Sequence, residues 1–477
     1  MVFSSTIFLF LFLPVVLAVY FALPWRFRNL FLLIASLFFY AWGETFYVVV
    51  MLTSITINYV FGRWIAATAE PRTRFLLVST GVALNMALLI YFKYANFLVD
   101  NLNVALKAVG IPAIDLAPIH LPLGISFFTF QALSYVVDVY RRHVPAARKF
   151  TDVALYVALF PQLIAGPIVR YSDVAAEIIK RTVTRPDFAS GVRLFIIGLG
   201  KKMLLANVLG EATDKIFAIP ANELTWQLGW LGPTLALLQL YLDFSAYSDM
   251  AIGLGRMFGF HFLPNFRYPL VAQTMTEFWQ RWHISLSTWF RDYLFTPLGG
   301  YRCSRARAYF NLLSVFFLCG LWHGASWNFI MFGMYQGMYL ILERIFKANR
   351  RPFFKSRLAH LYLWFVTVTT MVWFRAVDTE QAGAFYIAMF TGGSGMQLLH
   401  PIGLYLDNQS WAALFAAMFA ITPFTPWLKA KLLGASPSAG RAAAVQILGT
   451  LALGILFVLS AMKLAAGTHN PFIYFRF

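Results

Sequence analysis

The chain contains 35 consecutive residues without a formal charge, from Ala308 to Leu342. About 20 apolar residues suffice for one helical crossing of a bilayer, so this run is too long for a single crossing. Basic residues flank it at both ends, which predicts that it enters the membrane and returns to the cytoplasmic face. Its centre reads "LWHGASWN" and contains His323, where we expect the helical run to be interrupted as the chain turns back. Because an ionisable side chain is costly at membrane depth, we expect a function for this imidazole; the alternative is a histidine that only bonds neighbouring helices.

The composition indicates a membrane protein. Hydrophobic types make up 60% of the 477 residues and charged types 12%, and the mean hydropathy is +0.67. A soluble domain of this size could not bury so much apolar surface. The net charge of +18 would suggest nucleic-acid binding in a soluble protein, but here the basic residues lie between apolar runs. We therefore predict an all-α polytopic membrane protein whose basic loops contact lipid headgroups, with no nucleic-acid partner.

Basic loops alternate with apolar runs over the first 150 residues. The loops that we predict to be cytoplasmic are 26–28, 63–74 and 141–149. The loop at Glu44 and the loop 100–120 then lie on the opposite side of the membrane. On this alternation the N-terminus is periplasmic.

The middle of the chain has shorter and less regular apolar segments, such as "FPQLIAGPIV" near the end of 153–169. Irregular backbone at membrane depth survives only where protein or a water-filled cavity satisfies its polar groups, so this part is expected to build a cavity. We predict a single membrane domain over residues 1–477. It would have N-terminal spans in 1–150, a core with both histidine motifs in 151–345 and further spans in 346–477.

A second histidine, His283, lies in the tryptophan-rich segment 276–300. Apolar residues recur there at steps of three and four, which predicts one amphipathic helix at the membrane interface. The residues of its apolar face are Phe278, Trp282, Leu286, Trp289 and Tyr293. The alternative for His283 is contact with lipid headgroups alone.

A third candidate is Asp243, which follows the charge-free run 224–242. A buried carboxylate at this place could orient an imidazole or pair with an arginine. The alternative is an acid at the end of a helix, at the water boundary.

The residue types favour acyl transfer over other chemistries. An imidazole can act as a general base toward a hydroxyl, which suits transfer from a thioester to an alcohol. The chain has no G-x-S-x-G turn for a serine nucleophile and no G-x-x-x-x-G-K-[ST] phosphate loop. Cys319, His323 and His283 are too few ligands for a structural zinc site, and we predict no metal.

Seven segments resemble the membrane-bound O-acyltransferase family, in the branch of the alginate O-acetylation membrane protein. They are "MVFSSTIFLFLFLPVVLAVYF", "YFKYANF", "LPLGISFFTFQALSYVVDVYR", "FPQLIAGPIVRYSD", "YLDFSAYSDMAIGLG", "FWQRWHISLSTWFRDYLFTPLGG" and "GLWHGASWNF". They occur in one order and cover residues 1 to about 345. The C-terminal "NPFIYFRF" is also typical of this branch, while the likeness is weaker over 346–466.

The resemblance implies a ring of transmembrane and re-entrant helices that encloses a tunnel. It implies that His323 is the essential histidine, as general base or as a stabiliser of charge while the thioester collapses. His283 would orient the acyl group or bond the thioester carbonyl. Trp282 and Trp322 would line the tunnel. Two further residues, Asp243 and Arg281, would hold the motif segments together.

The resemblance also implies the reaction partners. No cofactor would be bound permanently, and acetyl-CoA would be the donor on the cytoplasmic side of the bacterial inner membrane. The acceptor would be a periplasmic acetyltransferase of the SGNH type, which modifies an exported polysaccharide, alginate or cellulose. Three alternative functions remain open. The first is acetylation of peptidoglycan or another cell-wall polymer. The others are transport or flipping of a donor without chemistry, and a structural role in an export complex.

Overall fold

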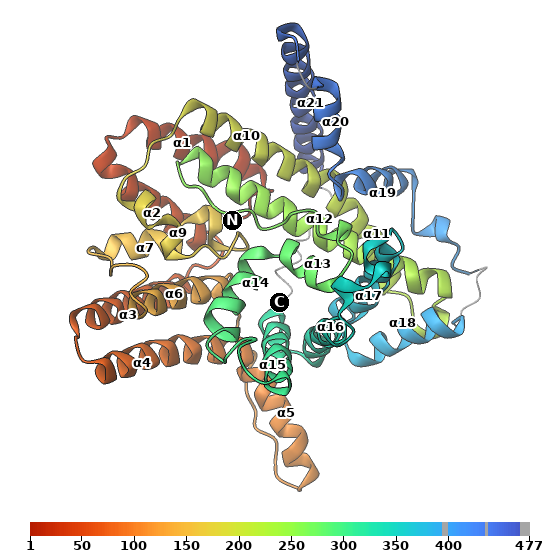
Figure 1. Ribbon diagram of the computed structural model, residues 1–477, viewed down its shortest axis with the longest axis horizontal. Coiled ribbons are helices and arrows are strands. Elements are labelled where there is room, and N and C mark those ends of the chain that lie inside the picture. Colours follow the sequence, from red (N-terminus) through yellow and green to blue (C-terminus); the bar gives the residue numbers. More distant parts are fainter. Residues whose placement is uncertain (394–398, 435–436, 468–477) are drawn as a thin grey trace. The chain divides into compact units, whose positions relative to one another are not determined.

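The structure is a computed structural model that describes residues 1–393, 399–434 and 437–467 (Figure 1). The regular secondary structure of the described residues is helical, and their only β-type pairing is an isolated bridge between Thr225 and Gly393. The predicted all-α fold is confirmed. The helices pack into two compact units, each of which is described by itself.

The first unit consists of residues 1–192 and 251–263. Its helices are α1 (Leu13–Ala22), α2 (Trp25–Ala41), α3 (Val48–Ala67), α4 (Pro71–Leu89), α5 (Ala95–Ala108), α6 (Ile125–Tyr140), α7 (Phe150–Ala158), α8 (Phe160–Leu163) and α9 (Tyr171–Ile179). Helix α6 packs against both α3 and α4 (Figure 1). Between α3 and α4, Asn85 Oδ1 accepts hydrogen bonds from Ser54 Oγ at 3.0 Å and Asn58 Nδ2 at 2.9 Å. This buried cluster joins two predominantly apolar helices.

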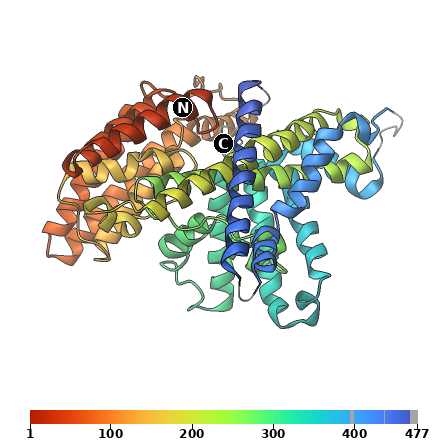
Figure 2. The same cartoon turned by 90° about the horizontal axis from the view of Figure 1, so that it is seen from above.

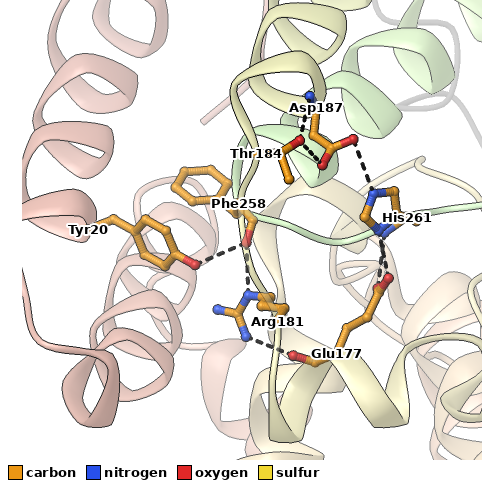
Figure 3. A network of polar contacts seen from close by, with 7 residues as sticks. All are labelled: Tyr20, Glu177, Arg181, Thr184, Asp187, Phe258 and His261. Carbon is orange, nitrogen blue, oxygen red and sulfur yellow. Dashed lines mark hydrogen bonds and ion pairs between the residues drawn. The ribbon is translucent and has the colours of Figure 1, made fainter.

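A polar network attaches the segment 251–263 to the rest of this unit (Figure 3). The carbonyl oxygen of Phe258 accepts bonds from Arg181 Nε at 2.8 Å and from the Tyr20 hydroxyl at 3.0 Å. His261 Nδ1 lies 2.7 Å from a carboxylate oxygen of Glu177. Three sequence-distant segments are therefore joined through one backbone carbonyl and one histidine.

The second unit consists of residues 193–250 and the part of 264–477 that the structure describes. Helices α10 (Arg185–Gly200) and α12 (Trp226–Met257) belong to both units. The others are α11 (Asn207–Phe217), α13 (Met275–Arg281), α14 (Ile284–Phe290), α15 (Arg305–His323), α16 (Trp327–Ile345), α17 (Ala359–Arg375), α18 (Thr379–Thr391), α19 (Asn408–Ala420), α20 (Phe424–Leu433) and α21 (Ala439–Ala465). The candidate functional residues all lie in this unit.

The charge-free run 308–342 folds as a helical hairpin. Helix α15 ends at His323 and α16 begins at Trp327, so the expected break is confirmed. The two helices approach so closely that a Cβ atom at Gly333 would lie 3.0 Å from the Cα of Gly320. Glycine at the crossing therefore allows the backbones to touch, as in many membrane helix pairs.

Several helices have the length and composition of membrane spans. Among the described helices these are α3, the run Pro71–Ala108 that contains α4 and α5, and α21, and the pair α19 and α20, bent by 66°, would count as one more. None of the most apolar stretch of α21, the dark-blue helix in Figure 2, is buried by the rest of the protein, as expected for a lipid-facing helix. The predicted multi-pass membrane protein agrees with these helices.

Candidate active site

His323 is the last residue of α15, and its side chain is buried. The ring meets the edges of Phe332 and Phe374, with centroids 5.4 and 5.8 Å away. The next residue, Gly324, has no room for a side chain, because a Cβ there would overlap the ring of Phe329. The W-H-G sequence thus ends a helix, buries an imidazole and lets the chain turn sharply into α16.

His283 lies at a break that the sequence did not predict. We expected one helix over 276–300, and this was wrong: α13 ends at Arg281 and α14 begins at Ile284. His283 itself has φ +43° and ψ +54°, the left-handed region, which costs a non-glycine residue about 1–2 kcal/mol. Its ring is fully buried, 4.6 Å from the ring of Phe244. His283 is therefore an interior residue and not a headgroup contact.

Asn265 holds this break in place. Its backbone oxygen accepts from Ile284 N at 2.9 Å, and its side-chain Oδ1 accepts from Ser285 N at 3.1 Å. The same Oδ1 lies 3.2 Å from His283 Nδ1. A second backbone bond, from Arg267 N to the carbonyl of Arg281, continues the pairing. These bonds offset the strain at His283.

The two histidines contact the same indole. The ring centroid of Trp322 lies 5.9 Å from that of His283 and 5.1 Å from that of His323. The structure thus brings together two motifs that lie 40 positions apart in the sequence. The two buried imidazoles therefore share one aromatic neighbour.

A small apolar cavity of about 10 Å³ adjoins His323, with room for roughly one water molecule. The residues that line it are Leu237, Leu240, Phe278, Trp282, His323, Phe332, Gln336, Thr367, Met371 and Phe374. Trp282 therefore borders a cavity beside His323, while Trp322 meets both imidazoles in edge-to-face geometry. A thioester needs far more space, so substrate entry requires these side chains to move apart.

Asp243 and Arg281 bond to other residues than expected. The carboxylate of Asp243 pairs with Lys202 Nζ at 2.8 Å, and both side chains are buried. This partner is a lysine of the π-helical turn Lys201–Ala206, whereas the sequence suggested an imidazole or an arginine. Arg281 pairs with Glu277 at 2.8 Å and donates to the carbonyl of Arg267 at 3.1 Å. Arg281 therefore helps to close α13 onto the 264–268 segment.

Comparison with known proteins identifies the family. The sequence profile of the membrane-bound O-acyltransferase family matches residues 86–376, more than half of the chain. This chain belongs to the membrane-bound O-acyltransferase family. It is 41% identical over all of both chains to the "Probable alginate O-acetylase AlgI" of Pseudomonas putida. It is 34% identical to the "Peptidoglycan O-acetyltransferase" of Helicobacter pylori over 84% of this chain and 81% of the relative. The "Teichoic acid D-alanyltransferase" of Bacillus subtilis is 26% identical over 48% and 60%.

As a member of this family, the protein is an O-acyltransferase. The structure adds residues to its site that sequence reasoning missed. Asn265 gave no signal, because an asparagine in "LPNFRYP" reads as an ordinary turn residue. Glu343 is the other: its carboxylate accepts from the backbone N–H groups of Met275 and Thr276 and anchors the start of α13. An acid directly after a 35-residue charge-free run was the one available hint.

No metal site accompanies these residues: in the part of the chain that the structure describes, no three His, Cys, Asp or Glu side chains are grouped as ligands. The described site residues are two imidazoles, aromatic rings and hydroxyl or amide groups. This set is suited to proton transfer and acyl positioning.

Proposed function

We propose that this protein is a membrane O-acetyltransferase that takes acetyl from acetyl-CoA on the cytoplasmic side of the bacterial inner membrane. It passes the acetyl group to a periplasmic acetyltransferase of the SGNH type, which O-acetylates an exported polysaccharide, alginate or cellulose. The observation that carries the chemistry is the placement of His283 and His323 against one indole, beside an apolar cavity. The full-length similarity to alginate O-acetylases supports the polymer class.

The reaction needs a proton acceptor and a stabiliser of charge. An acceptor hydroxyl attacks the thioester carbonyl, the C–O bond forms, the C–S bond breaks, and the hydroxyl proton finally reaches the sulfur of the departing thiol. His323, which borders the cavity, acts as general base or stabilises the charge on the thioester oxygen. The apolar lining excludes water and so favours transfer over hydrolysis of the thioester.

The test uses purified protein in liposomes with radiolabelled acetyl-CoA and an SGNH-type acetyltransferase. Removal of a general base costs about 10²–10⁴-fold in rate, and removal of an oxyanion stabiliser costs about 10²–10³-fold. For either role, His323→Ala and His323→Gln should each lose about 10²-fold or more in transfer. His261→Gln is the matched control, because that histidine is exposed and lies in the first unit. If the native protein and His323→Ala transfer the same amount of radiolabelled acetyl to the partner, His323 has no role in the mechanism. Uptake of label without transfer would instead indicate a transporter.

Peptidoglycan is the second candidate polymer, because the Helicobacter pylori relative covers most of this chain. A deletion strain separates the two. Acetate released by mild base from exopolysaccharide and from purified peptidoglycan is measured in the deletion strain and its parent. We expect the loss in the exopolysaccharide; a loss confined to peptidoglycan would contradict the proposal.

A further inference from the structure

The side chain of Asn265 has one possible orientation. Its Oδ1 lies 3.1 Å from Ser285 N, a backbone group that can only donate. If the amide were flipped, Nδ2 would face that N–H, and two donors would repel each other. The Ser285 hydroxyl also donates to Oδ1, at 2.9 Å. The oxygen of Asn265 therefore points to the 283–285 turn.

This orientation determines the tautomer of His283. Oδ1 of Asn265 is 3.2 Å from His283 Nδ1, and two lone pairs facing each other at this distance would repel. The Ser285 hydroxyl also lies near Nδ1, at 3.5 Å, but its hydrogen is directed to Oδ1, which is nearer at 2.9 Å. Nδ1 therefore carries the hydrogen, and in the neutral ring Nε2 carries the lone pair. His283 thus presents a hydrogen-bond acceptor to the interior.

That acceptor has no partner among the described residues, although His283 is fully buried. An unmet buried polar group costs about 1–3 kcal/mol, so a group that can donate is expected at this atom. A thioester carbonyl cannot donate, whereas the hydroxyl of the acyl acceptor can. Of the two roles that the family resemblance implies for His283, a bond to the thioester carbonyl therefore does not fit this tautomer.

We propose that Asn265 is a positioning residue that keeps His283 in the Nδ1–H tautomer, so that Nε2 accepts the hydrogen of the acceptor hydroxyl. The inference rests on the proposed acyl transfer and assigns its proton. His283 Nε2 takes the proton as the hydroxyl oxygen attacks the carbonyl carbon; the C–S bond then breaks and the proton passes to sulfur. Of the two roles open to His323, stabilisation of charge on the thioester oxygen remains.

The tautomer can be measured without any substrate. Protein with ¹⁵N-labelled histidine rings is studied by NMR in detergent, and the His283 signals are those missing from His283→Gln. We expect a protonated Nδ1 and a bare Nε2 in the native chain, and a mixture of tautomers in Asn265→Leu. A protonated Nε2 in the native chain would overturn the proposal, whether or not the protein transfers acetyl groups.

Transfer kinetics give the second readout. Asn265→Asp keeps the acceptor oxygen and should retain transfer within a few-fold, whereas Asn265→Leu should lose about 10²-fold in kcat with KM nearly unchanged. The backbone bond from Ile284 N to the Asn265 carbonyl survives in both variants, and equal elution on size exclusion confirms the fold. Native kcat in Asn265→Leu, or equal losses in both variants, would contradict a positioning role. If the native protein shows the expected tautomer but transfers no acetyl group, that result contradicts the proposed function and leaves the tautomer assignment intact.

Discussion

Replacement of Gly333 by alanine tests how the contact between α15 and α16 supports the site. The new Cβ atom would lie 3.0 Å from the Cα of Gly320 and would overlap the carbonyl oxygen of Phe316. Both obstacles are backbone atoms, so no rotamer change relieves them and the helices must separate. Overpacking of this kind costs about 1–3 kcal/mol, while alanine regains up to about 1 kcal/mol of helix propensity. The expected net loss is about 1–2 kcal/mol.

Gly383→Ala is the matched control. A Cβ atom at Gly383, inside α18, meets nothing within 4 Å, so only the helix propensity changes. We expect a small gain of about 0.5–1 kcal/mol there. The measurement is thermal unfolding in one detergent, repeated at several scan rates because a membrane protein of this size can unfold irreversibly. The unfolding midpoint should fall for Gly333→Ala and rise for Gly383→Ala. Equal shifts of the two variants would refute the argument from the helix crossing.

The same substitution should affect acyl transfer. His323 ends α15, while its neighbour Phe332 belongs to α16, with ring centroids 5.4 Å apart. Separation of the helices displaces the imidazole from one wall of the cavity. Transfer by folded Gly333→Ala protein should therefore fall about tenfold or more, since misplacement by about 1 Å can cost 10²-fold. Native transfer by this variant would show that the cavity adapts to the wider crossing.

Three further changes test other parts of the chain. Lys202→Met removes the cation from the buried pair with Asp243 and should destabilise by about 3–5 kcal/mol, whereas the double change with Asp243→Leu should recover much of the melting temperature. The Thr184 hydroxyl holds the pKa of Asp187, at the exposed start of α10, below its ordinary value. Asp187→Asn should therefore lower the melting temperature at neutral pH, and the difference should disappear as pH falls below about 4. Glu343→Gln weakens the anchor of α13 and should reduce both melting temperature and acetyl transfer, measured on the same sample.

The helical hairpin could be predicted from the sequence because two independent signals agreed. Basic residues at both ends of 308–342 indicated a return to the same face, and small residues after His323 indicated a break. The buried pair of Lys202 and Asp243 could not be predicted in this way. Charge alone favours any nearby cation, and the pair joins a π-helical turn to α12, two segments that are distant in the sequence.

The break at His283 escaped prediction because periodicity records where side chains recur and not the backbone angles between them. Steps of three and four from Phe278 to Tyr293 fit one continuous helix. The left-handed residue in the middle depends on Asn265, which is 18 positions away and bonds both backbone and ring. A long-range contact of this kind leaves no mark in the local pattern.

The same break explains how two neighbouring residues can both face the interior. In a continuous helix, Trp282 and His283 would be turned about 100° from each other, so one of them would lie beside the apolar face. The left-handed conformation removes this constraint, and both are buried, with exposed fractions of 7% and 0%. Trp282 then borders the cavity while His283 bonds Asn265. The strain of about 1–2 kcal/mol is thus the structural condition for burying an imidazole acceptor next in the chain to a tryptophan that borders the cavity.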